Sequence, residues 1–116
     1  MLLTIYHNPN CSKSRATLAI INEASVPVSV VDYLTTPPNK ATIKKILAAL
    51  ELAAIDVVRQ GEQAWAESEL TEDSPEEALI ELLIDKPILL QRPIVMRGDK
   101  AIIGRPPSNV LSLMDC

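Results

Sequence analysis

The chain has 116 residues, of which 47% are apolar, so it is long enough to bury one hydrophobic core. No apolar run approaches the ~18 residues of a membrane span, and the start lacks the basic and long apolar regions of a signal peptide. Aromatic residues are only 3%, which argues against a base-stacking nucleic-acid surface, and two cysteines do not make a disulfide framework. We expect a monomeric cytoplasmic protein with one domain, residues 1–116, that binds neither nucleic acid nor membrane.

The net charge of −4 is unevenly distributed. Residues 61–85 contain no Lys or Arg, and the rest of the chain carries eleven basic and six acidic residues. Such an acidic run is most often a solvated helical face, whereas the basic remainder suits a small anionic ligand better than DNA. The nine acids of the run are Glu62, Glu67, Glu69, Glu72, Asp73, Glu76, Glu77, Glu81 and Asp85.

The first third of the chain predicts a strand, a helix and a second strand. Residues 2–6 are apolar and β-branched, and the pattern changes to helical from Ser12. Residues 28–33 read as a strand that a right-handed crossover would place parallel to the first. The helix would bury one face that carries Leu18, Ile21 and Ala24.

The middle third predicts helices. Asn39 can cap a helix whose apolar side chains recur at helical spacing. Residues 53–86 read as an inserted, acidic helical segment, in which Ser74-Pro75-Glu76-Glu77 has the pattern of an N-cap with Pro at the first helical position. Trp65 would be a packing anchor of this segment. The apolar positions of the two helices are Ile43, Ile46, Leu47 and Leu50 in the first and Leu79, Leu82 and Leu83 in the second.

The last third predicts a hairpin and a short helix. Residues 94–96 and 101–103 flank Gly98-Asp99, a two-residue turn signal, and Pro106-Pro107-Ser108 opens the final helix. The element order therefore predicts an α/β fold with a mixed sheet covered by helices.

Cys11 lies between the first strand and the first helix, where the backbone N–H groups of the helix are still unpaired. These groups and the helix dipole favour thiolate over thiol, so Cys11 is a candidate nucleophile with a pKa below about 7. The alternative is that Cys11 is a small buried apolar residue.

Two arginines frame the hairpin. If the chain turns at Gly98-Asp99, the register places Arg92 opposite Arg105, on a strand face that carries Ile94 and would be the core-facing side. Each arginine precedes a proline, which holds its backbone extended. An anion between the guanidinium groups would relieve their repulsion, although each could instead pair with a carboxylate of the acidic segment.

Arg59 and His7 are the other candidates. Arg59 precedes a glycine break and could be an ordinary surface arginine. His7, the only histidine, could partner the thiol or lie in an exposed loop. One His and two distant cysteines match no zinc spacing, so we expect no metal.

Several motifs together resemble the glutaredoxin-coupled arsenate reductase (ArsC-type) family over essentially the whole chain. The Ser12-Lys13 pair after the cysteine, and the end of the chain soon after Arg105, resemble a short subgroup of that family. The motifs are His7-Asn8-Pro9-x-Cys11-x-x-Ser14-Arg15, Tyr33-Leu34-x-Thr36-Pro37, Arg59, Pro87-Ile88-Leu89-x-x-Arg92-Pro93-Ile94-Val95 and Gly104-Arg105-Pro106.

The resemblance implies a thioredoxin-like fold with an inserted helical arm and a cis peptide before Pro93. It implies that Cys11 is the nucleophile in the reduction of arsenate to arsenite. It also implies that glutathione is a co-substrate, that glutaredoxin is a partner, and that no cofactor is bound. By the same resemblance, Arg59, Arg92 and Arg105 bind the oxyanion, His7 helps to lower the pKa of the thiol, and Ser14 supplies a hydroxyl near the sulfur.

Two other functions are considered. Spx-type proteins share the fold and bind RNA polymerase, but they commonly carry a second cysteine where this chain has Ser14. A general glutathione-dependent thiol reductase would use the same nucleophile. Cys116 could be an inert end or a thiol that resolves a disulfide with Cys11.

Overall fold

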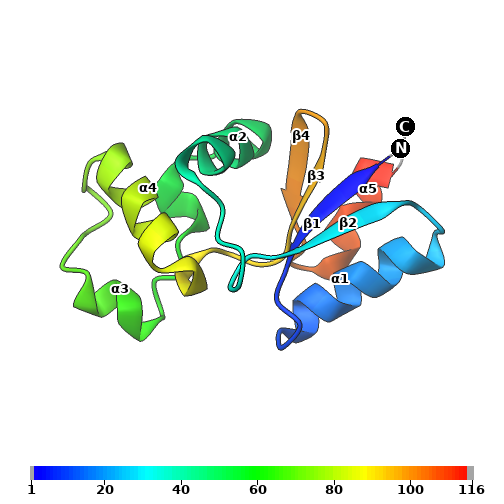
Figure 1. The fold of residues 1–116 in the computed structure, drawn as a ribbon, viewed down its shortest axis with the longest axis horizontal. Coiled ribbons are helices and arrows are strands. Elements are labelled where there is room, and N and C mark those ends of the chain that lie inside the picture. Colours follow the sequence, from blue (N-terminus) through cyan, green and yellow to red (C-terminus); the bar gives the residue numbers. More distant parts are fainter. Residues whose placement is uncertain (1, 115–116) are drawn as a thin grey trace.

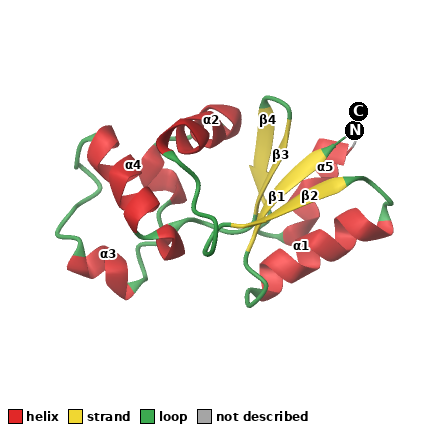
Figure 2. Ribbon diagram, in the orientation of Figure 1, coloured by secondary structure: helices red, strands yellow, loops and turns green. Residues whose placement is uncertain are grey.

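The computed structural model describes residues 2–114, so Cys116 lies outside the described residues. Its centre is a four-stranded mixed sheet with the strand order β2-β1-β3-β4 (Figure 2). Strands β1 and β2 are parallel, as predicted, and β1–β3 and β3–β4 are antiparallel. The strands are β1 (Leu3–His7), β2 (Val28–Asp32), β3 (Ile94–Arg97) and β4 (Lys100–Ile103).

Helices cover both faces of the sheet (Figure 1). Helix α1 (Ser12–Glu23), the 3₁₀ turn η3 (Pro107–Val110) and α5 (Leu111–Met114) lie on one face. Helix α2 (Lys40–Leu50) packs against the other face at β4. These elements and the strands form what we call the sheet unit. Their arrangement confirms the predicted α/β, thioredoxin-like fold class.

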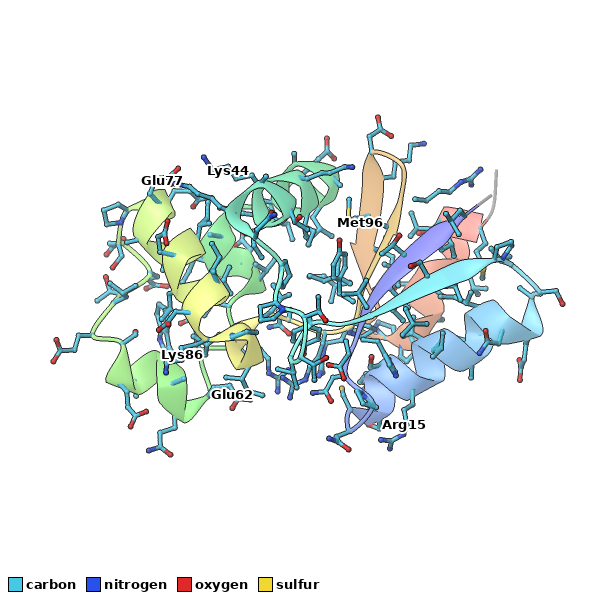
Figure 3. The ribbon with its side chains drawn as sticks, in the orientation of Figure 1. Arg15, Lys44, Glu62, Glu77, Lys86 and Met96 are labelled. Carbon is cyan, nitrogen blue, oxygen red and sulfur yellow. The ribbon has the colours of Figure 1, made fainter. Side chains whose placement is uncertain are left out.

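A helical arm, residues 54–90, extends from the sheet unit beyond α2 (Figure 1). An antiparallel bridge between Val58 and Leu90 closes the arm at its base. At its far end Lys44 of α2 pairs with Glu77 of α4 at 3.0 Å (Figure 3). The arm contains η1 (Ala54–Val57), α3 (Gln63–Glu67), α4 (Glu76–Asp85) and η2 (Pro87–Leu89).

The two faces of the sheet belong to two separate core clusters. Ile5 and Val95 pack with Ile21 of α1 on one face, while Tyr6, Ile94 and the apolar side of the arm pack on the other. The predicted core-facing side, which carries Ile94, is buried, and α1 and η3 cover the second face as well. None of the helices within residues 2–114 is long and apolar enough to cross a bilayer.

Local structure agrees with most of the sequence pattern. Asn39 caps α2 by accepting a hydrogen bond from the Thr42 N–H at 2.8 Å, as predicted. The hairpin turns at Gly98, whose φ of 61° is the left-handed conformation that glycine adopts without strain. Trp65 packs, partly buried, against the larger core cluster.

Two predicted details are wrong. Ser74 does not cap α4: Pro75 occupies the cap position, and the Ser74 hydroxyl accepts a hydrogen bond from the Thr71 N–H in the preceding turn. In α1, Ile21 is buried and Leu18 partly buried, as predicted, but Ala24 is exposed, and Ser14 and Thr17 are the other buried residues of the helix.

Candidate active site

Cys11 is the N-cap residue of α1, at the end of the loop that leaves β1. Its N–H donates to the Asn8 carbonyl at 3.0 Å, and Asn8 also accepts the Asn10 N–H on its side chain, so the loop is a tight, internally bonded turn. Arg15 ties the same loop to α1 by donating to the Pro9 carbonyl at 2.8 Å. The strand-to-helix transition therefore holds the sulfur at the start of the helix.

The pKa of the Cys11 thiol is lowered. Burial raises it, but hydrogen bonds from the Ser14 backbone, the Arg92 side chain and the Lys13 backbone outweigh that effect. The first-turn N–H groups act as the sequence indicated, because they are unpaired within the helix and face the sulfur. Cys11 is only partly buried, so the sulfur is also accessible to a reactant.

His7 and Ser14 contact each other next to the loop that carries Cys11. His7 is buried at the end of β1, which excludes the exposed loop position that was one of its two alternatives. Its Nδ1 lies 2.6 Å from the Ser14 hydroxyl oxygen, which also accepts the Asn8 N–H at 3.0 Å. The Ser14 hydroxyl thus fixes the turn, while its backbone N–H faces the sulfur. Burial lowers the pKa of His7, with Asp32 opposing the effect and Arg15 adding to it.

Arg92 and Arg105 approach Cys11 from the end of the hairpin. The observed register is the predicted one, but the ladder stops at Ile94 and Ile103; beyond it Pro93 has no N–H to donate and only accepts, from the Gly104 N–H at 2.9 Å. Both arginine–proline bonds are cis; the one before Pro93 is the one that the resemblance implied.

The two guanidinium groups each bond a backbone carbonyl, and both lie beside the Cys11 sulfur. Arg105 Nε donates to the Arg92 carbonyl at 2.9 Å, and Arg105 Nη2 lies 3.9 Å from Cys11 Sγ. Arg92 Nη1 donates to the Ile88 carbonyl at 3.2 Å. The alternative pairing with an acidic residue of the arm holds for Arg92, which faces Glu62, whereas Arg105 forms no ion pair with any described residue.

The base of the arm brings Arg59 close to Arg105, because both residues line one pocket. The Arg59 N–H donates to the Leu89 carbonyl at 2.7 Å, and the Gln91 N–H donates to the Val57 carbonyl at 2.8 Å. These bonds fix the backbone of Arg59 beside the segment that leads to Arg92. A pocket of about 400 Å³ opens there, within the size range of small-molecule sites. Its lining residues are Arg59, Gln60, Gly61, Glu62, Gln91 and Arg105.

A second hollow of about 660 Å³ adjoins the arginine pocket along β4. It shares Gln91 and Arg105 with the arginine pocket and continues between the end of α2 and η3. The space on the two sides of Arg105 therefore exceeds what a single small anion fills.

Three residues that the sequence analysis did not assign to the site take part in it. Asn8 fixes the loop, and Glu62 contacts two of the arginines. Tyr33 is fully buried and its side chain interacts with Arg92, yet its hydroxyl has no hydrogen-bond partner among the described residues. Asn8 and Tyr33 lie in motifs of the family resemblance, which was the only signal for them. Within residues 2–114 no group of three or more His, Cys, Asp or Glu could hold a metal ion.

Comparison with known proteins gives a consistent result. The sequence profile of the ArsC family matches residues 6–113. An uncharacterized protein, YfgD, from Escherichia coli K12 is 46% identical over 112 residues, which are 95% of this chain and 94% of that protein. An arsenate reductase from Neisseria meningitidis is 40% identical over 116 residues, 97% of either chain.

A solved structure of an arsenate reductase from Vibrio cholerae superposes with a TM-score of 0.93 at 36% identity and covers 97% of each chain. Sequence and structure thus agree over nearly the full length. The chain belongs to the ArsC family.

Proposed function

We propose that this protein reduces arsenate to arsenite, with the Cys11 thiolate as nucleophile. The observation that carries the proposal is the position of Cys11: a thiol with a lowered pKa at the start of α1, with Arg92 and Arg105 beside its sulfur. Thiolate and guanidinium groups together suit attack on a tetrahedral oxyanion, because the cations offset the charge of both reactants. Relatives described as arsenate reductases favour arsenate as that oxyanion.

In the first step, the thiolate displaces one oxygen of arsenate, which leaves as water after protonation, and an S–As(V) bond forms. Arg59, Arg92 and Arg105 would bind the remaining oxygens and stabilise the charge that develops on them. The thiol of glutathione then attacks the Cys11 sulfur. The S–As bond breaks with its electron pair on arsenic, so arsenite leaves and a mixed disulfide remains.

Glutaredoxin attacks the mixed disulfide by thiol exchange, which restores the Cys11 thiolate and moves glutathione to glutaredoxin. An external reductant is consistent with the site, because Ser14 stands where a second cysteine of a Cys-x-x-Cys pair would be. The hollow along β4 next to Arg105 offers room for a tripeptide thiol. No tightly held cofactor enters this scheme.

The test is a coupled assay with arsenate, glutathione, glutaredoxin, glutathione reductase and NADPH, with wild type beside Cys11→Ser. We expect NADPH oxidation that requires both arsenate and Cys11. Fully reduced wild type without arsenate-dependent turnover would refute the proposal. If Cys11-dependent turnover occurs with a low-molecular-weight mixed disulfide and not with arsenate, the protein is a general thiol reductase instead.

A further inference from the structure

Glu62 differs from the other acids of the acidic run. Eight of the nine are exposed, whereas Glu62 is partly buried and lines the arginine pocket. Its Oε1 accepts a hydrogen bond from Arg59 Nε at 3.3 Å and lies 4.0 Å from Arg92 Nη2. Figure 3 shows Glu62 on the arm and Arg15 on α1, both along the lower edge of the molecule in this view. A carboxylate therefore stands inside a site whose other charged groups are cations.

One oxygen of this carboxylate remains available to a ligand. Both contacts with arginine involve Oε1, and no described residue donates a hydrogen bond to Oε2. The side chain retains 30% of its exposure, so solvent or a ligand can reach it. Arg59 keeps the Glu62 carboxylate in place through their ion pair, which joins two residues three apart at the base of the arm.

An ionised carboxylate can only accept hydrogen bonds. A tetrahedral oxyanion that carries a proton can direct its O–H at Oε2 while its other oxygens face the arginines. An oxyanion without a proton would instead place two acceptors against each other, which costs free energy without any compensating bond. At neutral pH arsenate and inorganic phosphate carry at least one proton, and sulfate carries none.

We propose that Glu62 is a specificity-determining residue that selects protonated oxyanions by accepting their O–H and disfavours fully deprotonated ones. The proposal rests on the proposed function for the identity of the arginine pocket as the substrate site. It goes beyond that function by assigning the choice among tetrahedral anions to one side chain of the arm.

The test measures dissociation constants of phosphate, arsenate and sulfate at pH 7 by calorimetry on the full chain with Cys11→Ser, which prevents thiol chemistry. We expect the parent to bind phosphate and arsenate more tightly than sulfate. Glu62→Gln retains an oxygen for Arg59 and replaces the free acceptor with a donor. The ratio of the sulfate to the phosphate dissociation constant should therefore fall about tenfold or more, mainly through tighter sulfate binding.

Glu67→Gln is the matched control, because it removes the same charge from α3 at an exposed position that bonds only Gln63. It should change the affinity of all three anions similarly and leave the ratio intact. An unchanged ratio in Glu62→Gln, an equal fall in Glu67→Gln, or a parent that binds none of the anions would overturn the proposal. The two proposals can fail separately. If the anion selectivity depends on Glu62 but the protein does not turn over arsenate, this inference holds and the proposed function is wrong.

Discussion

The sheet unit and the helical arm contribute different chemistry to one site. The sheet unit holds the thiol and lowers its pKa through the first turn of α1 and through Arg92. The arm supplies Arg59 and Glu62, which line the adjoining pocket and do not contact the sulfur. In the proposed function, activation of the nucleophile and recognition of the anion thus rest on separate parts of the chain, with Arg92 and Arg105 at their junction.

The largest effect is expected from Arg92→Ala, because Arg92 serves both parts. Loss of one positioned donor to a developing oxyanion typically costs about 10²–10³-fold in turnover. The coupled assay should show a fall in kcat/KM of that order. Iodoacetamide kinetics against pH should also show the pKa of Cys11 moving up toward its ordinary value, since Arg92 is one of the groups that lower it.

Arg15→Ala is the control for Arg92→Ala, because it removes the same charge near the loop from a side chain that bonds the Pro9 carbonyl. We expect a much smaller change in both measurements. If the two variants behave alike, the reactivity of Cys11 depends on the total positive charge around the loop and not on the contact of Arg92 with the sulfur.

Arg59→Ala should separate the two parts. Loss of a charged hydrogen bond to the oxyanion should weaken binding of phosphate by about tenfold or more, and Glu62 would lose the ion pair that holds its carboxylate in place. The pH profile of Cys11 alkylation should stay where it is in wild type, because Arg59 is absent from the groups that shift its pKa. A displaced profile would show that the arm takes part in thiol activation after all.

Two glycines, Gly104 in the sheet unit and Gly61 in the arm, allow the stability effects of an added methyl group to be compared between the two regions. A Cβ added to buried Gly104 would lie 2.5 Å from Thr17 Oγ1 and 2.7 Å from Pro93 Cγ, whereas one added to Gly61 meets nothing within 4 Å. Gly104→Ala should therefore lower the free energy of unfolding by about 1–3 kcal/mol in urea titrations, because overpacking forces α1 and the hairpin apart. Gly61→Ala should be close to neutral, and equal losses in both variants would contradict this account.

The sequence predicted the parts of the site that depend on neighbours along the chain. Helix periodicity and the short strand before it put Cys11 at a helix start, and Gly98-Asp99 gave the register of the hairpin. Arg92 and Arg105 could be brought near each other from that register alone. Their actual bonds could not, because the ladder ends at Ile94 and Ile103, before it reaches either arginine, and each side chain then follows its own local contacts.

Residues whose role depends on distant segments escaped prediction. Glu62 stands in a run of nine acids, and its spacing from Arg59 was the only local sign that it differs from the eight exposed ones. The pairing of His7 with Ser14 needs the packing of β1 against α1, which periodicity does not specify. Tyr33 reads as an ordinary core residue, and only the fold puts its hydroxyl beside Arg92.

The smallest predicted effect is a pH-dependent difference in stability between wild type and Cys11→Ser, measured under reducing conditions. The folded protein lowers the pKa of Cys11, so the native thiolate contributes stability that is fully present above the ordinary thiol pKa of about 8.5. That contribution disappears as the pH falls through the lowered pKa, because both states are then protonated. The free energy of unfolding of wild type minus that of the variant should therefore increase from acidic to alkaline pH.

The increase should be about 1.4 kcal/mol for every tenfold change in the ionisation constant of the thiol. Cys116 is present in both proteins, so its ionisation contributes equally to both free energies of unfolding and cancels when they are subtracted. Adding Arg59→Ala to both should leave the curve in place, and adding Arg92→Ala should flatten it, because Arg92, unlike Arg59, is among the groups that lower the pKa of the thiol. A curve that flattens with Arg59→Ala would mean that the arm stabilises the thiolate, and the division of labour between the two parts would then be wrong.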